Sequence, residues 1–201
     1  MDTTYKSSGY DRGHLIPAGD VKWSKEAMSS SFYFSNISPQ DPGLNRGRWR
    51  MLESQVREWA KTNKSVHVVT GPALEQGILE KIGPNKVSVP SYYYKVIWDD
   101  QEPELKGIGF IMPNQTLSGS IEDYAVTIDS VEVFTGIDFY STLSDPLEDS
   151  LEANINLSAW GFGKDSEYRE EENTRCLTIT EDGTRCERTT TNESGYCWQH
   201  E

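Results

Sequence analysis

Residues 8–15 read SGYDRGHL, and the four residues at the centre, Asp11 to His14, combine an acid, a guanidinium, a glycine and an imidazole. The imidazole of His14 can exchange a proton near neutral pH, because its ordinary pKa is about 6.5. The guanidinium of Arg12 can grip a phosphate through two hydrogen bonds, and Asp11 can orient either side chain. Gly13 allows the backbone to bend or a substrate to approach. The alternative interpretation is a polar turn that carries a surface histidine.

Two stretches further along the chain narrow these alternatives. Residues 35–40 read SNISPQ, and residues 44–53 read LNRGRWRMLE. Together with residues 11–14 they resemble the DNA/RNA non-specific endonuclease family, a group of ββα-metal (His-Me finger) nucleases that includes endonuclease G and secreted bacterial enzymes. The family pattern is Asp-Arg-Gly-His, then Asn-x-x-Pro-Gln, then Asn-x-Gly-x-Trp-x-x-Leu-Glu, and all three parts occur here in order. Later landmarks extend the resemblance over residues 8–160.

The resemblance implies an α+β fold with a central antiparallel sheet. Its ββα unit would consist of a hairpin that carries His14, a loop, and a helix that begins at Asn45 or the residue before it. Apolar residues over 49–60 recur at three- and four-residue steps, which predicts this helix from the sequence itself. The same spacing places Asn45, Trp49 and Glu53 on one side of the helix.

Other elements are predicted from local composition. Residues 24–31 read as a brief helix with Ser24 as its cap. Strands are expected over residues 32–37, 65–72 and 107–114, a pair of strands over residues 87–98 with a break at Pro90, and a loop over residues 39–43. His67 alternates with valines, and we interpret it as a strand residue without a catalytic role.

Phosphodiester hydrolysis needs an activated water, neutralisation of charge on the phosphoryl oxygens, and help for the leaving 3′-oxygen. His14 is the candidate general base. Mg²⁺ prefers oxygen ligands and keeps several waters, which suits the side-chain carbonyl of Asn45 as its protein ligand. Glu53 can then hold one of the metal-bound waters. The resemblance implies the same roles for these three residues, with Mg²⁺ or Mn²⁺ as the cofactor. Asn45 as a helix cap and a surface ion pair between Glu53 and Arg57 are the structural alternatives.

The remaining site residues come from the resemblance. It implies that Arg12 and Arg57 contact phosphate and that Asn36 orients the active site. Arg48 lies near the start of the expected helix, where it either only solvates the helix start or, close to a phosphate site, assists substrate binding.

The charge of the chain is unevenly distributed. The net charge is −13, yet residues 1–61 hold nine Lys/Arg and seven Asp/Glu, a balance of +2, which leaves −15 for the remainder. The acidic part therefore lies away from the candidate site, where its simplest role is solubility. We expect substrate binding to be weak and sensitive to salt.

The start of the chain bears on stability and localisation. Residues 1–8 are polar, and we expect them to be loose. Family members usually carry several β-strands before Asp-Arg-Gly-His, which are missing here, so the chain is either a fragment or a fold that tolerates their loss. The sequence shows no signal peptide and no apolar run of the ~18 residues that a membrane helix needs. Many relatives are secreted or periplasmic, which leaves localisation undecided, and oligomeric state is equally undetermined.

The C-terminal part of the chain differs in composition. We expect an endonuclease domain over residues 1–160, a linker over residues 161–174, and a small module over residues 175–201. All the cysteines lie in this module, in the pattern Cys-x₉-Cys-x₁₀-Cys-x₂-His formed by Cys176, Cys186, Cys197 and His200. Three thiolates and one imidazole suit a closed structural Zn²⁺ site. One disulfide with an odd thiol, or free thiols, are the alternatives. A protein partner or a structural cap are the expected roles of the module.

The sequence therefore predicts a metal-dependent, sequence-non-specific endonuclease that hydrolyses DNA and RNA and leaves 5′-phosphate ends. The alternative is a nuclease-like binding module without catalytic activity, targeted by its zinc tail. The presence of His14, Asn45 and Glu53 together favours the enzyme.

Overall fold

The computed structural model describes residues 4–74, 80–101, 105–162, 174–175 and 189–190. The chain divides into two compact units, Met1–Phe162 and Gly163–Glu201. The four ligands expected to bind zinc lie outside the described residues. Within the described residues of the second unit, β9 (Thr174–Arg175) pairs antiparallel with β10 (Thr189–Thr190). Among the described residues, no helix has both the length and the apolar character needed to cross a membrane.

A four-stranded antiparallel sheet forms the centre of the first unit, with the strand order β3-β6-β7-β8. The strands are β3 (His67–Ala73), β6 (Tyr92–Asp99), β7 (Lys106–Pro113) and β8 (Ala125–Val126), and a separate hairpin joins β4 (Lys81–Ile82) to β5 (Val87–Ser88). His67 is a strand residue, as expected, and it stacks on Trp98 with ring centroids 4.9 Å apart. The expected α+β class with an antiparallel sheet is therefore confirmed.

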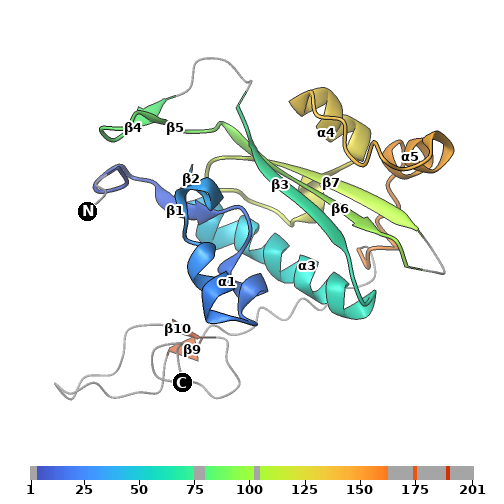
Figure 1. Cartoon of the computed structure of the whole chain (residues 1–201), viewed down its shortest axis with the longest axis horizontal. Helices are drawn as coiled ribbons and strands as arrows, with labels where there is room; N and C mark the ends of the chain where they lie inside the picture. The colour runs from blue at the N-terminus through green and yellow to red at the C-terminus, as the bar shows by residue number, and fades with distance from the viewer. Residues whose placement is uncertain (1–3, 75–79, 102–104, 163–173, 176–188, 191–201) are drawn as a thin grey trace. The chain divides into compact units, whose positions relative to one another are not determined.

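Helices cover both faces of this sheet (Figure 1). Successive side chains of β6 point to opposite faces of the sheet. One set, Tyr93, Lys95 and Ile97, faces α3 (Arg50–Thr62), and the other, Tyr94 and Val96, faces α4 (Ile128–Thr135). The α3 side holds the larger core, to which Leu52, Val56, Trp59, Ile108, Phe110, Met112 and Trp160 contribute. The other side is closed by α4, with α5 (Asp145–Glu152) beside it.

Two glycines of β7 allow α4 and α5 to approach the central sheet closely. A Cβ at Gly107 would lie 2.7 Å from a methyl of Ile128 and 2.8 Å from the carbonyl oxygen of Leu151. A Cβ at Gly109 would lie 2.6 Å from a methyl of Val131. All three distances are below ordinary van der Waals contact, so only glycine lets α4 and α5 settle on this face.

The ββα unit lies on the α3 side. β1 (Asp11–His14) pairs antiparallel with β2 (Ile37–Gln40), so that Asp11 faces Gln40 and His14 faces Ile37. Between them the chain forms η1 (Ala18–Val21), α1 (Lys25–Ser30) and η2 (Phe34–Asn36). After β2 come α2 (Pro42–Leu44), the π-helical segment η3 (Asn45–Trp49) and then α3. The helix over residues 24–31 is confirmed as α1, whose cap Ser24 accepts a hydrogen bond from the backbone nitrogen of Ala27 at 2.9 Å.

Three local expectations are wrong. Residues 32–36 form a turn and a 3₁₀ helix, and the strand begins at Ile37, because β1 offers only four residues to pair with. The loop expected over residues 39–43 contains the end of β2 and the start of α2, where Asp41 accepts hydrogen bonds from the backbone nitrogens of Gly43 and Leu44. An Asp cap before Pro42 at the first helical position is a start signal that the sequence carried.

The third correction concerns the N-terminus. Thr4 and Tyr5 are buried, with only 2% and 9% of their surface exposed. Tyr5 packs with Ile82 and Val89 of the β4–β5 region. The residues before β1 are thus held by an apolar contact with a hairpin that lies far along the sequence.

Candidate active site

Asp11 ties the first strand of the ββα unit to the start of its helix. Its carboxylate accepts hydrogen bonds from Arg46 Nε at 2.8 Å, from Arg46 Nη2 at 2.6 Å and from Asn45 Nδ2 at 2.9 Å. The bonds from Arg46 are the main reason that the pKa of Asp11 falls below its ordinary value, and the bond from Asn45 adds to the effect. Asp11 therefore orients Asn45 and Arg46, and the expectation that it orients Arg12 or His14 is wrong.

Asn45 is placed so that its carbonyl oxygen remains available. Its amide nitrogen donates to Asp11, which fixes the orientation of the amide group. Its carbonyl oxygen accepts no hydrogen bond from any residue that the structure describes. The helix cap at this end is Asp41, so the alternative role of Asn45 as a cap is not formed. A fixed amide with a free oxygen is a suitable ligand for a hard cation such as Mg²⁺.

The helix is irregular immediately after Asn45. Gly47 has φ −102° and ψ −116°, values outside the helical range, and the segment Asn45–Trp49 has π-helical hydrogen bonding. Local π-helical turns widen a helix and are frequent at functional sites. Trp49 remains buried at the end of this segment with 1% of its surface exposed, so the irregularity does not loosen the core.

His14 ends β1 and is half-buried. Its ring meets Phe32 edge to face, with centroids 4.7 Å apart. Its Nε2 atom is buried and finds no hydrogen-bond partner within the described part of the chain. Burial lowers the pKa of His14 below 6.5, and a backbone hydrogen bond to Arg12 acts in the opposite direction. The ring is therefore held mainly neutral at pH 7 with one nitrogen unused, which is the state a general base requires.

Gly13 has a steric role next to His14. A Cβ at this position would overlap the side chain of Gln40, which is fully buried against the β1–β2 ribbon. The glycine thus admits a neighbouring side chain, and neither a sharp backbone bend nor a bound substrate is needed to explain it.

Glu53 faces a buried lysine that the sequence analysis did not single out. Lys95 of β6 has 2% of its surface exposed, donates from Nζ to Thr70 Oγ1, and lies with Nζ 4.9 Å from the ring centroid of Trp49. Burial raises the pKa of Glu53 well above 4.5, and the charge of Lys95 is the largest influence against that rise. Burial likewise lowers the pKa of Lys95, and the charge of Glu53 opposes this. The charge of each residue is therefore the main electrostatic influence that stabilises the ionised form of the other against the cost of burial.

One feature of the sequence indicates that Lys95 is buried with a partner. The strand over residues 92–98 reads YYYKVIW, in which a lysine is the only ionisable group besides tyrosines. A lysine is almost never fully buried unless it has a partner, so its position pointed to an acid elsewhere in the fold.

Arg57 connects α3 to the segment that follows His14. Its Nη1 donates to Asp20 Oδ1 at 2.8 Å, and its Nη2 donates to Ser54 Oγ at 3.0 Å. The surface pair between Glu53 and Arg57 considered above is absent from the ion pairs of the described residues. Asp11 is bound at the start of the helix, and Asp20 is bound further along it. The segment between these two acids, which carries His14, is therefore held at both ends.

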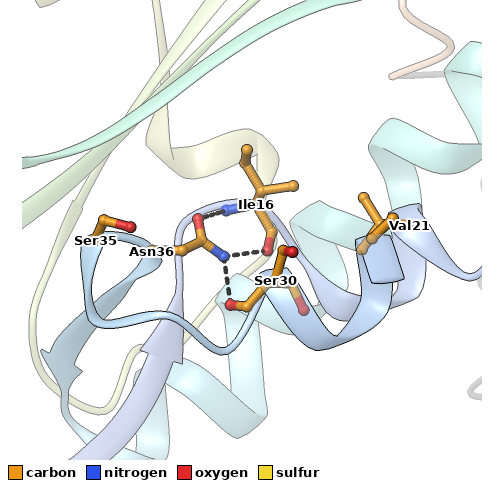
Figure 2. A pocket seen from close by; sticks show the side chains of 7 residues that line it. Ile16, Val21, Ser30, Ser35 and Asn36 are labelled. Carbon is orange, nitrogen blue, oxygen red and sulfur yellow. Dashed lines mark hydrogen bonds between the residues drawn. The ribbon is translucent and has the colours of Figure 1, made fainter. Parts of the chain in front are cut away.

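Asn36 uses its whole amide on the backbone. Its Oδ1 accepts from Ile16 N at 2.9 Å, and its Nδ2 donates to Ile16 O at 2.9 Å and to Ser31 O at 2.8 Å. Figure 2 shows these bonds at the edge of a pocket of about 400 Å³. The pocket is lined by Ile16, Val21, Ala27, Ser30, Ser31, Ser35 and Asn36, none of which is charged. Asn36 thus fixes the backbone two residues beyond His14 and has no donor left for a substrate.

The other two predicted arginines differ in accessibility. Arg12 is exposed, and its guanidinium carbon lies 5.5 Å from the ring centroid of Tyr5. Arg48 is half-buried, with Nη1 3.0 Å from Met51 Sδ, and its buried Nε has no hydrogen-bond partner among the described residues.

The structure thus groups the predicted residues into separate sets. Asn45 belongs with Asp11, and Glu53 belongs with Lys95 and Arg57. No hydrogen bond of the described residues joins His14 to Asn45 or to Glu53.

Three consecutive aromatic side chains are exposed in the connection that leads from α1 into β2. Phe32, Tyr33 and Phe34 keep 58%, 64% and 59% of their surface exposed. Phe32 is also the ring that His14 contacts. Exposed rings in a row beside a candidate catalytic residue give flat apolar faces on which planar groups can stack.

Comparisons with known proteins agree with these features. The profile of a family described as "DNA/RNA non-specific endonuclease" matches residues 1–146. The chain is 35% identical over 147 residues to "Endonuclease G, mitochondrial" of Bos taurus, which covers 67% of this chain and 49% of that protein. It is 37% identical over 154 residues to "Nuclease EXOG, mitochondrial" of Xenopus laevis, covering 69% and 43% respectively. It is 34% identical over 162 residues to a protein named "Nuclease" of Nostoc sp., covering 76% and 58%.

A solved structure supports the same comparison at the level of fold. A crystal structure of the EndoG/EndoGI complex contains a chain that matches with a TM-score of 0.66 and 37% identity, over 71% of this chain and 63% of that one. The chain spans about half the length of the curated endonuclease G relatives that it matches.

Proposed function

Because this chain belongs to the DNA/RNA non-specific endonuclease family, we propose that it is a metal-dependent endonuclease that hydrolyses DNA and RNA without sequence specificity. The observation that carries the proposal is the arrangement at Asn45. Its amide nitrogen is fixed on Asp11 and its carbonyl oxygen accepts no hydrogen bond from the described residues. An amide oxygen that is oriented in this way and free of protein donors suits a metal ligand, which favours an enzyme over a binding module without catalysis.

The catalytic roles proposed here are those that the sequence motifs suggest, and the surroundings of His14 and Asn36 support theirs. His14 has a free ring nitrogen and a lowered pKa, so it can remove a proton from the attacking water. The resulting hydroxide attacks the phosphorus and forms a new P–O bond as the P–O3′ bond breaks, which leaves a 5′-phosphate and a 3′-oxygen that takes a proton from water. Arg12 and Arg57 would contact the phosphate, and Arg48 would add charge at the start of the helix. Asn36 acts indirectly, because its hydrogen bonds hold the backbone beyond His14.

The residues present fit a single hard cation. Asn45 would be its direct protein ligand, and the carboxylate of Glu53 would hold one of its waters. When bound, Mg²⁺ or Mn²⁺ would stabilise negative charge on the phosphoryl group and on the leaving 3′-oxygen. A cation near Glu53 would also favour its ionised form, which burial otherwise disfavours.

Substrate binding would depend on more than charge. The first 61 residues carry a balance of only +2, so few phosphates are neutralised. The exposed rings of Phe32, Tyr33 and Phe34 would supply stacking faces for bases. Stacking is tolerant of sequence because every base has a π-face, which agrees with a non-specific enzyme.

Plasmid nicking in Mg²⁺ tests this proposal. We expect the purified chain to convert supercoiled DNA to the nicked form and EDTA to stop the reaction. Asn45→Ala should raise the Mg²⁺ concentration needed for half-maximal rate by about 10- to 100-fold, as expected for loss of a metal ligand or its supporting group. Asn154→Ala, which removes an exposed amide, is the matched control and should leave the midpoint unchanged. Equal midpoints for Asn45→Ala and wild type would contradict the ligand assignment, and absence of nicking would contradict the function.

We also infer that the second unit is a zinc module, with Cys176, Cys186, Cys197 and His200 as ligands. Its support is the cysteine spacing and the pairing of β9 with β10, which flank the segment that carries the first two cysteines. A module as short as residues 175–201 can build only a small core of its own, so a bound metal would supply most of the folding energy.

Metal analysis checks the zinc module. Protein purified under reducing conditions should contain one Zn²⁺ per chain, and His200→Ala should reduce its zinc affinity at least tenfold. His67→Ala, which removes a histidine from the central sheet, should keep the zinc. Wild-type protein free of zinc, or equal affinity in His200→Ala, would refute the assignment.

A further inference from the structure

An acidic cluster distinct from the candidate active site lies in the helical layer on the face of the sheet opposite α3. Between Lys106 and Lys164 the sequence contains nine Asp or Glu residues and no Lys, Arg or His. This stretch supplies β7, β8, α4 and α5. Its acids therefore have no basic neighbour along the sequence to neutralise them.

Three of these acids converge in space. Asp129 and Glu132 on α4 and Glu152 at the end of α5 each place one carboxylate oxygen within 4.8 Å of the others. None of the three belongs to an ion pair of the described residues. Glu132 is fixed in addition by a hydrogen bond of 2.6 Å that its Oε1 accepts from the backbone nitrogen of Phe139. Carboxylates that repel one another are thus held together by the fold.

Glu152 gives independent evidence for a missing ligand. Only 6% of its surface is exposed, and its buried Oε1 has no hydrogen-bond partner in the part of the chain that the structure describes. Burial raises the pKa of Glu152 to about 7, and the nearby carboxylates of Glu132, Glu148, Asp129 and Asp138 raise it further. A buried carboxylate without a partner is strongly unfavourable, so it must either take up a proton or bind a cation.

We propose that Asp129, Glu132 and Glu152 bind a calcium ion that joins α4 to α5. All the donors are oxygens, which a hard cation requires. Ca²⁺ accepts several carboxylate oxygens in a flexible geometry, whereas Mg²⁺ demands a near-ideal octahedron, keeps several of its waters and usually takes one or two carboxylates. The three carboxylate oxygens lie within 4.8 Å of one another, which is close enough for them to share one ion. Waters would complete the shell.

This site is separate from the one at Asn45. α4 and α5 lie on one face of the central sheet, and α3 lies on the other (Figure 1). The ion would neutralise the acidic face at the point where α5 meets α4, and its role would be structural. It requires neither Asn45 nor His14.

Calcium titration of the full chain tests the site. In buffer free of Mg²⁺, CaCl₂ should raise the Tm of the wild type by about 5–10 °C when calcium exceeds its Kd a hundredfold. Calorimetry should detect binding with a Kd below about 1 mM, as for carboxylate-rich Ca²⁺ sites. Asn45→Ala should retain this shift, which distinguishes the site from the catalytic one.

Glu152→Gln is the decisive variant. Without calcium its Tm should equal or exceed that of the wild type, because the change removes a buried charge and its repulsion from the neighbouring carboxylates. It should lose the calcium-induced shift and keep nicking activity in Mg²⁺. Asp149→Asn, which removes an exposed charge from the same helix, controls for net charge and should keep the shift. An unchanged shift in Glu152→Gln, or no shift in the wild type at about 10 mM calcium, would show that Glu152 is instead a protonated, metal-free carboxyl.

Discussion

Replacing His14 by alanine should reduce DNA cleavage by about 10²- to 10⁴-fold, because general-base catalysis typically contributes that much. His14 is the only histidine in the ββα unit, and its buried Nε2 has no partner among the described residues. Folding should survive, since the ring makes one edge contact, with Phe32. Such a contact contributes about 0.5–1.5 kcal/mol. Single-turnover nicking in Mg²⁺ and urea unfolding are the measurements.

The pH dependence of the wild type gives a second readout of the same residue. A general base acts in its neutral form, and burial lowers the pKa of His14 below 6.5. Lowering the pKa keeps the neutral form populated to lower pH, so the acid limb of log kcat/KM should have its midpoint below 6.5. His67→Ala, which removes a histidine from β3, should behave as wild type. Cleavage at an unaltered rate in His14→Ala would show that another group activates the water.

Replacing Lys95 by methionine should lower the free energy of unfolding by about 3–5 kcal/mol where Glu53 is ionised, because it leaves a buried charge without its partner. Burial raises the pKa of Glu53 above 4.5, and removal of Lys95 raises that pKa further. The folded state then binds a proton that the unfolded state has lost, so stability falls as pH rises above 4.5 and through the raised value. The destabilisation should therefore be larger at about pH 8 than at about pH 5. Urea unfolding in EDTA at both pH values measures it.

Two further variants test whether the loss of stability arises from the buried pair of charges. The double variant Lys95→Met/Glu53→Gln removes both charges and should recover most of the lost stability, because a buried pair can be replaced by neutral groups at little cost. Lys61→Met breaks an exposed pair with Glu58 and should cost at most about 1 kcal/mol. A pH-independent loss in Lys95→Met would mean that packing on Trp49, and not the charge of Glu53, is what the lysine provides.

Much of the ββα unit was predictable because its signals are local. The apolar spacing after Asn45 predicted the helix, and Ser24 predicted the cap of α1. Strand composition predicted β3, β6 and β7 to within a few residues, and the break at Pro90 separates β5 from β6 as expected. The errors occurred where neighbours in space override composition. Residues 32–34 are aromatic enough for a strand, but β1 pairs only with Ile37–Gln40, and the rings are left exposed.

The sequence by itself determined the family, the order of the catalytic motifs, and the residue types available for the chemistry. These depend on identities and spacings along one chain. Only the tertiary structure decided which side chains meet. Asp11 binds Asn45 across 34 positions of sequence, and Lys95 compensates Glu53 from a strand of the central sheet. Likewise, Glu152 meets Asp129 and Glu132 because α5 settles beside α4 over two glycines of β7. The physical reason is that hydrogen bonds and charge compensation act over a few ångströms, and chain folding alone brings residues from distant positions to that distance.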